Sequence, residues 1–112
     1  MFGLTESHRY YLYQGVADMR KGFNGLSGIV MDLMGGDPLD GSVYIFINRR
    51  RNRMKILLWE HSGFLMYYKR LERGTFELPA STETGINWET LMLMLSGISL
   101  KRIVKRKRYR RA

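Results

Sequence analysis

Arginine and lysine dominate two short stretches of this chain. Five of the seven residues from 49 to 55 are basic and none is acidic: Arg49, Arg50, Arg51, Arg53 and Lys55. A second run near the C-terminal end holds Lys101, Arg102, Lys105, Arg106, Lys107, Arg108, Arg110 and Arg111. The guanidinium fork of arginine fits the oxygens of a phosphate, and lysine offers a point charge to the same oxygens. These residues therefore predict phosphate binding on a polyanion such as DNA.

The net charge of +9 is concentrated at the C-terminal end. Residues 100–112 hold eight basic residues and no acid, which leaves eleven basic and ten acidic residues in 1–99. Charge gathered at two places on a nearly neutral body is typical of proteins that bind nucleic acid. Two other interpretations stay open: a turn that only keeps a sheet edge soluble, and a terminal segment that is merely solvated or disordered.

Side chains suited to catalysis or metal binding are scarce. His8 and His61 lie far apart in the sequence, cysteine is absent, and the ten carboxylates are spread singly. Metal sites and nucleophile–base pairs need such groups in a recognisable arrangement, and two-metal phosphoryl transfer needs several converging acids. We therefore expect no enzyme, no cofactor, and no catalytic or metal-binding residue.

The basic turn joins two of three strands expected within residues 43–71. Val, Ile, Tyr, Phe and Trp crowd into runs of about six residues, separated by the basic turn and by His61-Ser62-Gly63, as in a β-meander. If the turns are centred on Arg51 and Ser62, both faces of the sheet are apolar, so each is either covered or presented to a partner. One face would hold Val43, Ile45, Leu57, Trp59, Leu65 and Tyr67, and the other Tyr44, Phe46, Ile56, Leu58, Met66 and Tyr68.

Two helices and a further strand complete the expected domain. Residues 9–16 predict the strand, and Asp18 is expected to cap a helix with an apolar stripe formed by Leu26, Ile29, Val30 and Leu33. A second helix is expected from Asn87, after an irregular connection anchored by Phe76 and Leu78. The predicted fold is α+β: an antiparallel β-meander of three to four strands with two short helices packed on it. Residues 1–99 would form one domain, and residues 100–112 a basic, mobile tail.

Aromatic residues on the expected strands allow another kind of contact with nucleic acid. Tyr44, Phe46, Trp59, Tyr67 and Tyr68 could stack on exposed bases, as aromatic residues do in sheet-based single-strand binders. In a small domain most such side chains belong to the core. Both interpretations remain open at this point.

No segment predicts membrane insertion or export. The chain has no run of eighteen apolar residues, and it does not begin with a basic segment followed by an apolar one. The lack of cysteine is compatible with a reducing compartment. We therefore expect a cytoplasmic protein without a membrane partner.

Three segments of the chain resemble a known family. They are GVADMRKGFNGLSGIV at 15–30, VYIFINRRRNRMKILLWEHSGFLMYYKRLERGTFELP at 43–79, and LSGISL at 95–100 followed by the basic end. They resemble the small Orf2-like accessory proteins, often called TnpB, of IS66-type bacterial insertion sequences. The resemblance implies a part in transposition of a mobile DNA element, beside a separate, larger transposase that performs the strand chemistry. It carries over no catalytic or metal-binding residue.

Two functions are expected from the residues and the resemblance together. In the first, a non-catalytic accessory protein binds DNA phosphates, with the element ends as the expected target, through the arginine turn and the tail. In the second, a protein-interaction module docks on the transposase or self-associates through an apolar sheet face, without a direct role at DNA. A homo-oligomer is compatible with both.

Overall fold

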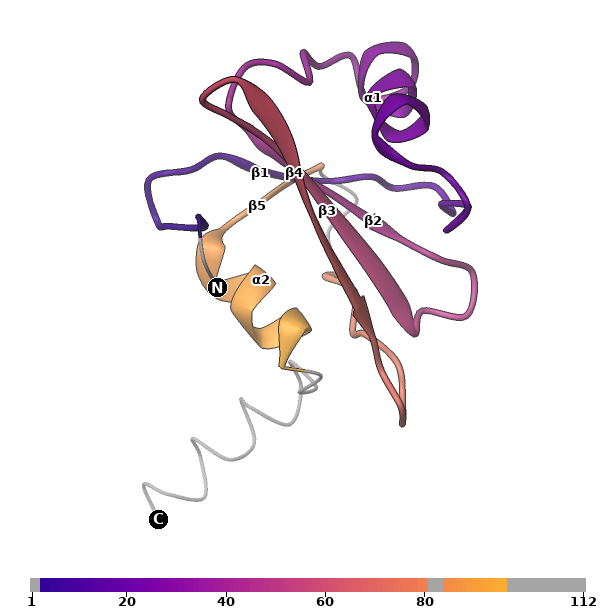
Figure 1. Cartoon of the computed structure of the whole chain (residues 1–112). Coiled ribbons are helices and arrows are strands. Elements are labelled where there is room, and N and C mark those ends of the chain that lie inside the picture. Colours follow the sequence, from indigo (N-terminus) through magenta and orange to yellow (C-terminus); the bar gives the residue numbers. More distant parts are fainter. Residues whose placement is uncertain (1–2, 81–83, 97–112) are drawn as a thin grey trace.

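A mixed β-sheet with helices on both faces forms the centre of the molecule (Figure 1). The computed structural model describes residues 3–80 and 84–96. Within them the sheet has five strands in the order β4-β3-β2-β1-β5. The elements are β1 (Tyr10–Leu12), α1 (Phe23–Asp32), β2 (Val43–Ile47), β3 (Arg53–Glu60), β4 (Gly63–Arg70), β5 (Gly85–Ile86) and α2 (Trp88–Leu95). The α+β class is confirmed, while the predicted tail at 100–112 lies outside the described residues.

The first strand makes the sheet mixed rather than wholly antiparallel. β1 pairs in parallel with β2, with Tyr10 opposite Val43 and Leu12 opposite Ile45. The other three pairings are antiparallel, which was expected for β2 with β3 and for β3 with β4. Parallel neighbours need a crossover connection, and α1 lies in the connection between β1 and β2. The additional strand, β5, has only two residues, too few for an alternating pattern to reveal in the sequence.

The register of the meander differs by one residue from the expected one at both turns. Val43 lies opposite Leu58 rather than Trp59, and Leu58 lies opposite Leu65 rather than Met66. At the second turn His61, with a φ of 59°, takes the left-handed conformation, and Glu60 pairs with Gly63. The first shift turns the side chains of β3 to the opposite face, and the second shift returns those of β4 to the expected face. The expected faces are therefore wrong only for β3. One face carries Val43, Ile45, Ile56, Leu58, Leu65 and Tyr67, and the other Tyr44, Phe46, Leu57, Trp59, Met66 and Tyr68.

Both faces of the sheet are covered. On the face of Tyr44, α1 buries the expected stripe except for Leu33, which follows the end of the helix and is 66% exposed. On the other face, α2 packs beside the fully buried ring of Phe76. In the described part of the chain, the long strand β4 has a neighbour on one side only. The meander therefore offers no open central face, and its free surface is the β4 margin.

The two helices begin in different ways. α2 starts where expected and Asn87 is its N-cap, because the Asn87 side chain accepts a hydrogen bond from the Thr90 N–H at 2.8 Å. α1 instead begins after Gly22, and no side chain caps it. The expected cap, Asp18, accepts hydrogen bonds from the backbone and side chain of Arg20. Asp18 therefore organises the segment before α1 and does not cap the helix.

Titration of Tyr44 makes the stability of the fold depend on pH in the alkaline range. Its hydroxyl donates to the Asp37 carbonyl at 3.1 Å and lies 3.3 Å from the Asp40 carboxylate. Burial, helped by the Asp40 charge, raises the pKa of Tyr44 to about 12. Because this pKa exceeds the unfolded value of about 10, the stabilisation is complete below that pH and is lost as pH rises toward 12.

We expect the free energy of unfolding to fall by about 2 kcal/mol between about pH 10 and 12 on account of this residue. Urea denaturation followed by circular dichroism at several pH values measures the effect. Tyr44→Phe is the control, because it keeps the ring and removes the titrating hydroxyl. Equal pH dependence in the two proteins would contradict the assignment.

Candidate nucleic-acid interface

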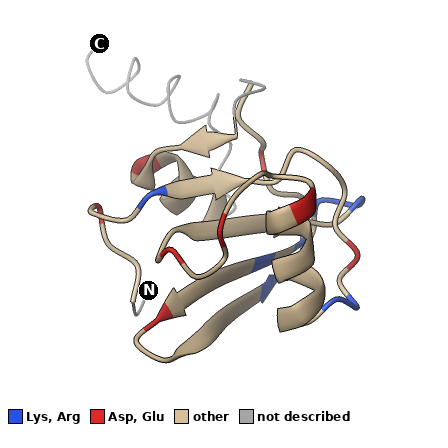
Figure 2. Cartoon of the chain, turned by 90° about the horizontal axis from the view of Figure 1, so that it is seen from above, with Lys and Arg blue, Asp and Glu red and all other residues tan. Residues whose placement is uncertain are grey.

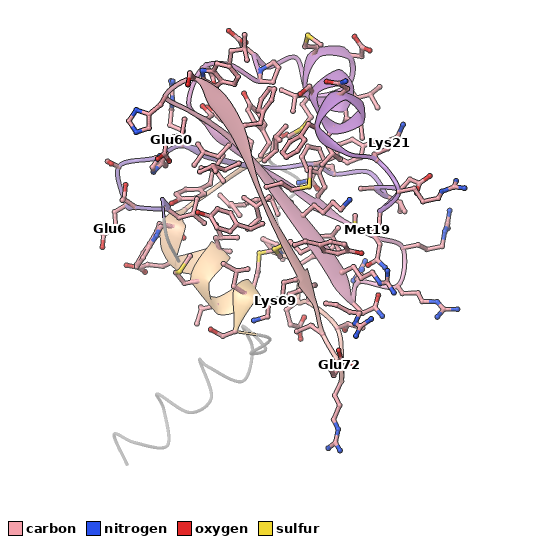
Figure 3. All side chains as sticks on the ribbon, in the orientation of Figure 1. Glu6, Met19, Lys21, Glu60, Lys69 and Glu72 are labelled. Carbon is pink, nitrogen blue, oxygen red and sulfur yellow. The ribbon has the colours of Figure 1, made fainter. Side chains whose placement is uncertain are left out.

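Most of the described Lys and Arg residues lie toward one end of the sheet, whereas Asp and Glu residues are spread over both ends (Figure 2). The arginine turn, residues 49–53, joins β2 to β3, and β4 ends beside it because Arg70 pairs with Arg53. At the other end β3 finishes with Glu60, which Figure 3 shows on the same side as Glu6 and far from Lys21. A polyanion would therefore be drawn to the end of the sheet that carries the arginine turn.

A side-chain amide holds the arginine turn in one conformation. Asn48 Oδ1 accepts hydrogen bonds from the backbone N–H groups of Asn52 at 3.0 Å and Arg53 at 2.9 Å. Asn48 Nδ2 donates to Asn52 Oδ1 at 2.8 Å, and the N–H of Arg51, with a φ of 58°, donates to the Asn48 carbonyl. These asparagines were not predicted as site residues. The available signal was an asparagine beside the basic run, where such side chains commonly bond to nearby backbone.

The segment from 71 to 76 fixes the same turn from outside the hairpin. The N–H of Leu71 donates to the Asn52 carbonyl at 2.8 Å, and the N–H of Phe76 donates to the Arg51 carbonyl at 2.6 Å. The ring of Phe76 is only 1% exposed, so the core anchors this segment. The turn thus has a fixed backbone, whereas three of its side chains, Arg49, Arg50 and Arg51, are exposed.

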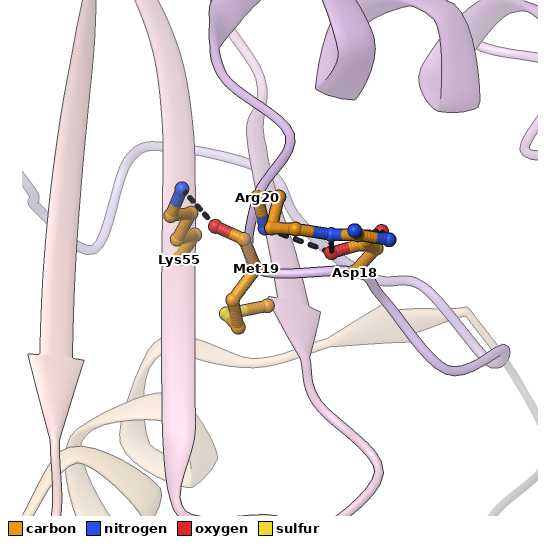
Figure 4. A network of polar contacts seen from close by, with 4 residues as sticks. All are labelled: Asp18, Met19, Arg20 and Lys55. Carbon is orange, nitrogen blue, oxygen red and sulfur yellow. Dashed lines mark hydrogen bonds and ion pairs between the residues drawn. The ribbon is translucent and has the colours of Figure 1, made fainter.

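Lys55 differs from the arginines of the turn. Only 7% of it is exposed, and Nζ donates to the carbonyls of Met19 and Lys21 at 2.8 Å each. Figure 4 shows its bond to Met19 and the adjoining Asp18–Arg20 pair. Nζ also lies 4.9 Å from the centroid of the Tyr68 ring. Lys55 therefore ties the segment before α1 to β3, and its buried ammonium group faces these carbonyls rather than solvent.

The segment that Lys55 anchors brings two further basic residues toward the turn. Arg20 and Lys21 are exposed, and residues 16–19 line a shallow pocket together with Arg49, Arg50 and Arg53. Asp18 offsets part of this charge: its ion pair with Arg20 is 2.8 Å long, and the hydrogen bonds from Arg20 lower the pKa of Asp18 to about 2. Arg20 and Lys21 were not predicted as site residues, although two adjacent basic residues were a visible signal.

β4 and the end of α2 complete this end of the molecule. Arg53 Nη1 donates to the Tyr68 hydroxyl at 3.1 Å, and Arg70 pairs with Glu72 at 2.8 Å. Lys69 Nζ donates to the carbonyl of Leu95, so α2 ends near the basic end of β4. The predicted contacts in the tail lie outside the described residues: Lys101, Arg102, Lys105, Arg106, Lys107, Arg108, Arg110 and Arg111.

Replacing Lys55 by Met is expected to lower the free energy of unfolding by about 2 kcal/mol, because two charge-assisted hydrogen bonds are lost while the chain length is kept. Chemical denaturation measures the loss. Lys69→Met is the matched control, since Lys69 is exposed and donates to one carbonyl. A loss for Lys55→Met no greater than that of the control would contradict the anchoring role.

Two kinds of site are not found among residues 3–80 and 84–96. No group of three or more His, Cys, Asp or Glu side chains there is arranged to hold a metal ion. No helix in the same residues is both long and apolar enough to cross a membrane.

Comparison with known proteins identifies the family. The sequence model described as "IS66 Orf2 like protein" matches residues 8–105, which include the arginine turn and every described helix and strand. Two proteins of Sinorhizobium fredii (strain NBRC 101917 / NGR234) are similar to the chain, and both are named as uncharacterized. Protein y4jC is 30% identical over 113 residues, covering 99% of this chain and 96% of the relative. Protein y4hO is 36% identical over 93 residues, covering 80% of each chain. No solved structure matches significantly. The chain therefore belongs to the IS66 Orf2-like family, known as TnpB, and is an accessory protein of an insertion sequence.

Proposed function

We propose that this protein binds DNA during transposition, as a non-catalytic accessory protein that contacts phosphates through its arginine turn and its C-terminal tail. The observation that carries the proposal is the presentation of Arg49, Arg50 and Arg51. They are exposed on a turn whose backbone Asn48 and the 71–76 segment hold in place. A fixed backbone lowers the entropy lost on binding, because only the side chains remain to be ordered.

The two basic regions would act in different ways. The turn supplies arginines at fixed positions, which suits contacts that set the orientation of the protein on DNA. The eight basic residues of the tail supply most of the net charge, which suits attraction that does not depend on sequence. In this proposal the strand chemistry belongs to the separate transposase of the same element, and this protein acts with it at the element ends.

Fluorescence anisotropy with labelled duplexes tests the proposal. One duplex is taken from an element end and the other is unrelated but equal in length. We expect similar affinities for both and a loss of about a thousandfold between about 50 and 200 mM salt, if about six phosphates are neutralised. Absence of binding at the lowest salt concentration would refute it.

A second candidate function is docking on the transposase. The covered sheet faces leave no open central sheet surface in the described residues, but apolar side chains are exposed around α1. Val16 is 54%, Met31 55% and Leu33 66% exposed. Val16 and Leu33 line one shallow pocket beside α1, which is distinct from the pocket at the arginine turn. Exposed apolar residues that share a pocket are a feature of protein interfaces.

Co-purification with the transposase distinguishes the two candidates. A complex that persists after nuclease treatment and after truncation at Leu100 favours docking. A complex that disappears with the DNA favours the first proposal.

A further inference from the structure

The five aromatic residues that could stack on bases are placed very differently by the structure. Tyr44 and Phe46 are buried in the core, and Trp59 and Tyr67 are partly buried. Tyr68 alone is half exposed, at 50%. The structure thus separates one accessible ring from four that pack within the protein.

Tyr68 lies beside the basic end of the sheet and is held there by two cations. Its hydroxyl accepts a hydrogen bond from Arg53 at 3.1 Å, and Lys55 Nζ is 4.9 Å from its ring centroid. Lys55 is itself fixed by the carbonyls of Met19 and Lys21. The ring is therefore oriented before any ligand arrives, and the guanidinium of Arg53 lies at its hydroxyl edge.

A second aromatic group lies further along the same side of β4. Phe64 stacks with Phe23 at a centroid distance of 6.2 Å, and Trp59 meets the edge of Phe64 at 4.9 Å. Phe23 is 46% exposed. Phe64 and Tyr68 point to the same face because they are four residues apart on one strand, a separation of about 13 Å.

We propose that this side of β4 binds single-stranded DNA, with one unpaired base stacked on Tyr68 and the strand continuing toward Phe23 and Phe64. Exposed aromatic rings next to a basic groove are the means by which proteins hold single strands without reading sequence. A base within a duplex already stacks on its neighbours, so Tyr68 contributes to single strands only. The inference rests on the proposed DNA binding and adds the class of DNA that the β4 surface prefers.

Anisotropy titrations with labelled oligo(dT) and with a duplex, each in the presence of wild-type protein or a Tyr68 variant, test this site. Tyr68→Leu is expected to weaken oligo(dT) binding about tenfold and to leave duplex binding unchanged. Tyr68→Phe is expected to stay near wild type, because it keeps the ring and loses only the bond with Arg53. Phe23→Leu, at the other end of the proposed track, is expected to weaken oligo(dT) binding as well.

The other outcomes are distinct. If Tyr68→Leu weakens both DNAs equally or neither, the single-strand site is refuted while the proposed function stands. Failure of the wild type to bind either DNA refutes both. If Tyr68→Leu abolishes co-purification with the transposase and leaves oligo(dT) binding unchanged, the surface serves a protein partner and the inference is wrong.

Discussion

Replacing Arg49 and Arg50 by Gln and Arg51 by Asn is expected to weaken duplex binding about a hundredfold at about 0.1 M salt, if each arginine contacts one phosphate. The plot of log K against log salt has a negative slope, and this slope should become shallower by about three units, one for each lost contact. Asn is chosen at position 51 because that residue has a φ of 58°, which Asn tolerates well. Anisotropy at several salt concentrations gives both quantities.

The control for charge alone is a comparison of single variants. Arg50→Gln removes one charge from the turn. Arg9→Gln removes one charge just before β1, at the opposite end of the sheet, where β3 ends at Glu60. If binding depends only on net charge, the two variants should weaken it equally. We expect a clear loss for Arg50→Gln and little change for Arg9→Gln. A triple variant with the wild-type salt slope would show that the turn does not contact phosphates.

The largest expected loss of stability follows the replacement of Phe76 by Ala. The ring is fully buried on the α2 face of the sheet, so its removal leaves a cavity and should cost about 3–4 kcal/mol. That is a large share of the 5–15 kcal/mol typical of a small domain. Urea denaturation measures the loss. Leu39→Ala is the control, because Leu39 is 53% exposed and should change stability by less than about 1 kcal/mol.

The same residue links the core to the arginine turn. Phe76 N–H donates to the Arg51 carbonyl, so loosening the 71–76 segment should also loosen the turn. Phe76→Leu, which keeps most of the buried volume, is expected to cost less than about 1.5 kcal/mol and to preserve DNA binding. A Phe76→Ala protein as stable as the Leu39→Ala control would contradict the burial.

Elements defined by local patterns were predictable from the sequence. The three strands of the meander and the start of α2 at Asn87 follow from apolar patterns and the turn residues between them. Phe76 was expected as an anchor because it is an apolar residue within an irregular connection. The register did not follow, because the length of the first loop depends on the hydrogen bonds that the Asn48 side chain makes. A change of one residue there moved every β3 side chain to the other face.

Residue type and spacing alone did not predict which basic residues are exposed for binding. Lys55 and Arg53 are two positions apart and look equivalent in the sequence. Arg53 lies at the start of β3 next to the turn, whereas Lys55 is covered by a segment more than thirty residues earlier in the chain. That difference depends on contacts between distant segments, which periodicity does not reveal. Arg20 and Lys21 approach the turn for the same reason.

The hydrogen bonds around the arginine turn also determine how its amide protons exchange with solvent. Amides at an exposed hairpin tip ordinarily exchange fast, since local opening there costs little free energy. Here the N–H groups of Arg51, Asn52 and Arg53 are all bonded within the turn, and Leu71 and Phe76 bond to its carbonyls. Exposing the amides of Arg51, Asn52 and Arg53 breaks their bonds to Asn48, and moving the turn as a whole also breaks its carbonyl bonds to the 71–76 segment, which the buried ring of Phe76 anchors. The turn and the strands below it therefore form one cooperative unit, and its amides should exchange as slowly as those of the sheet.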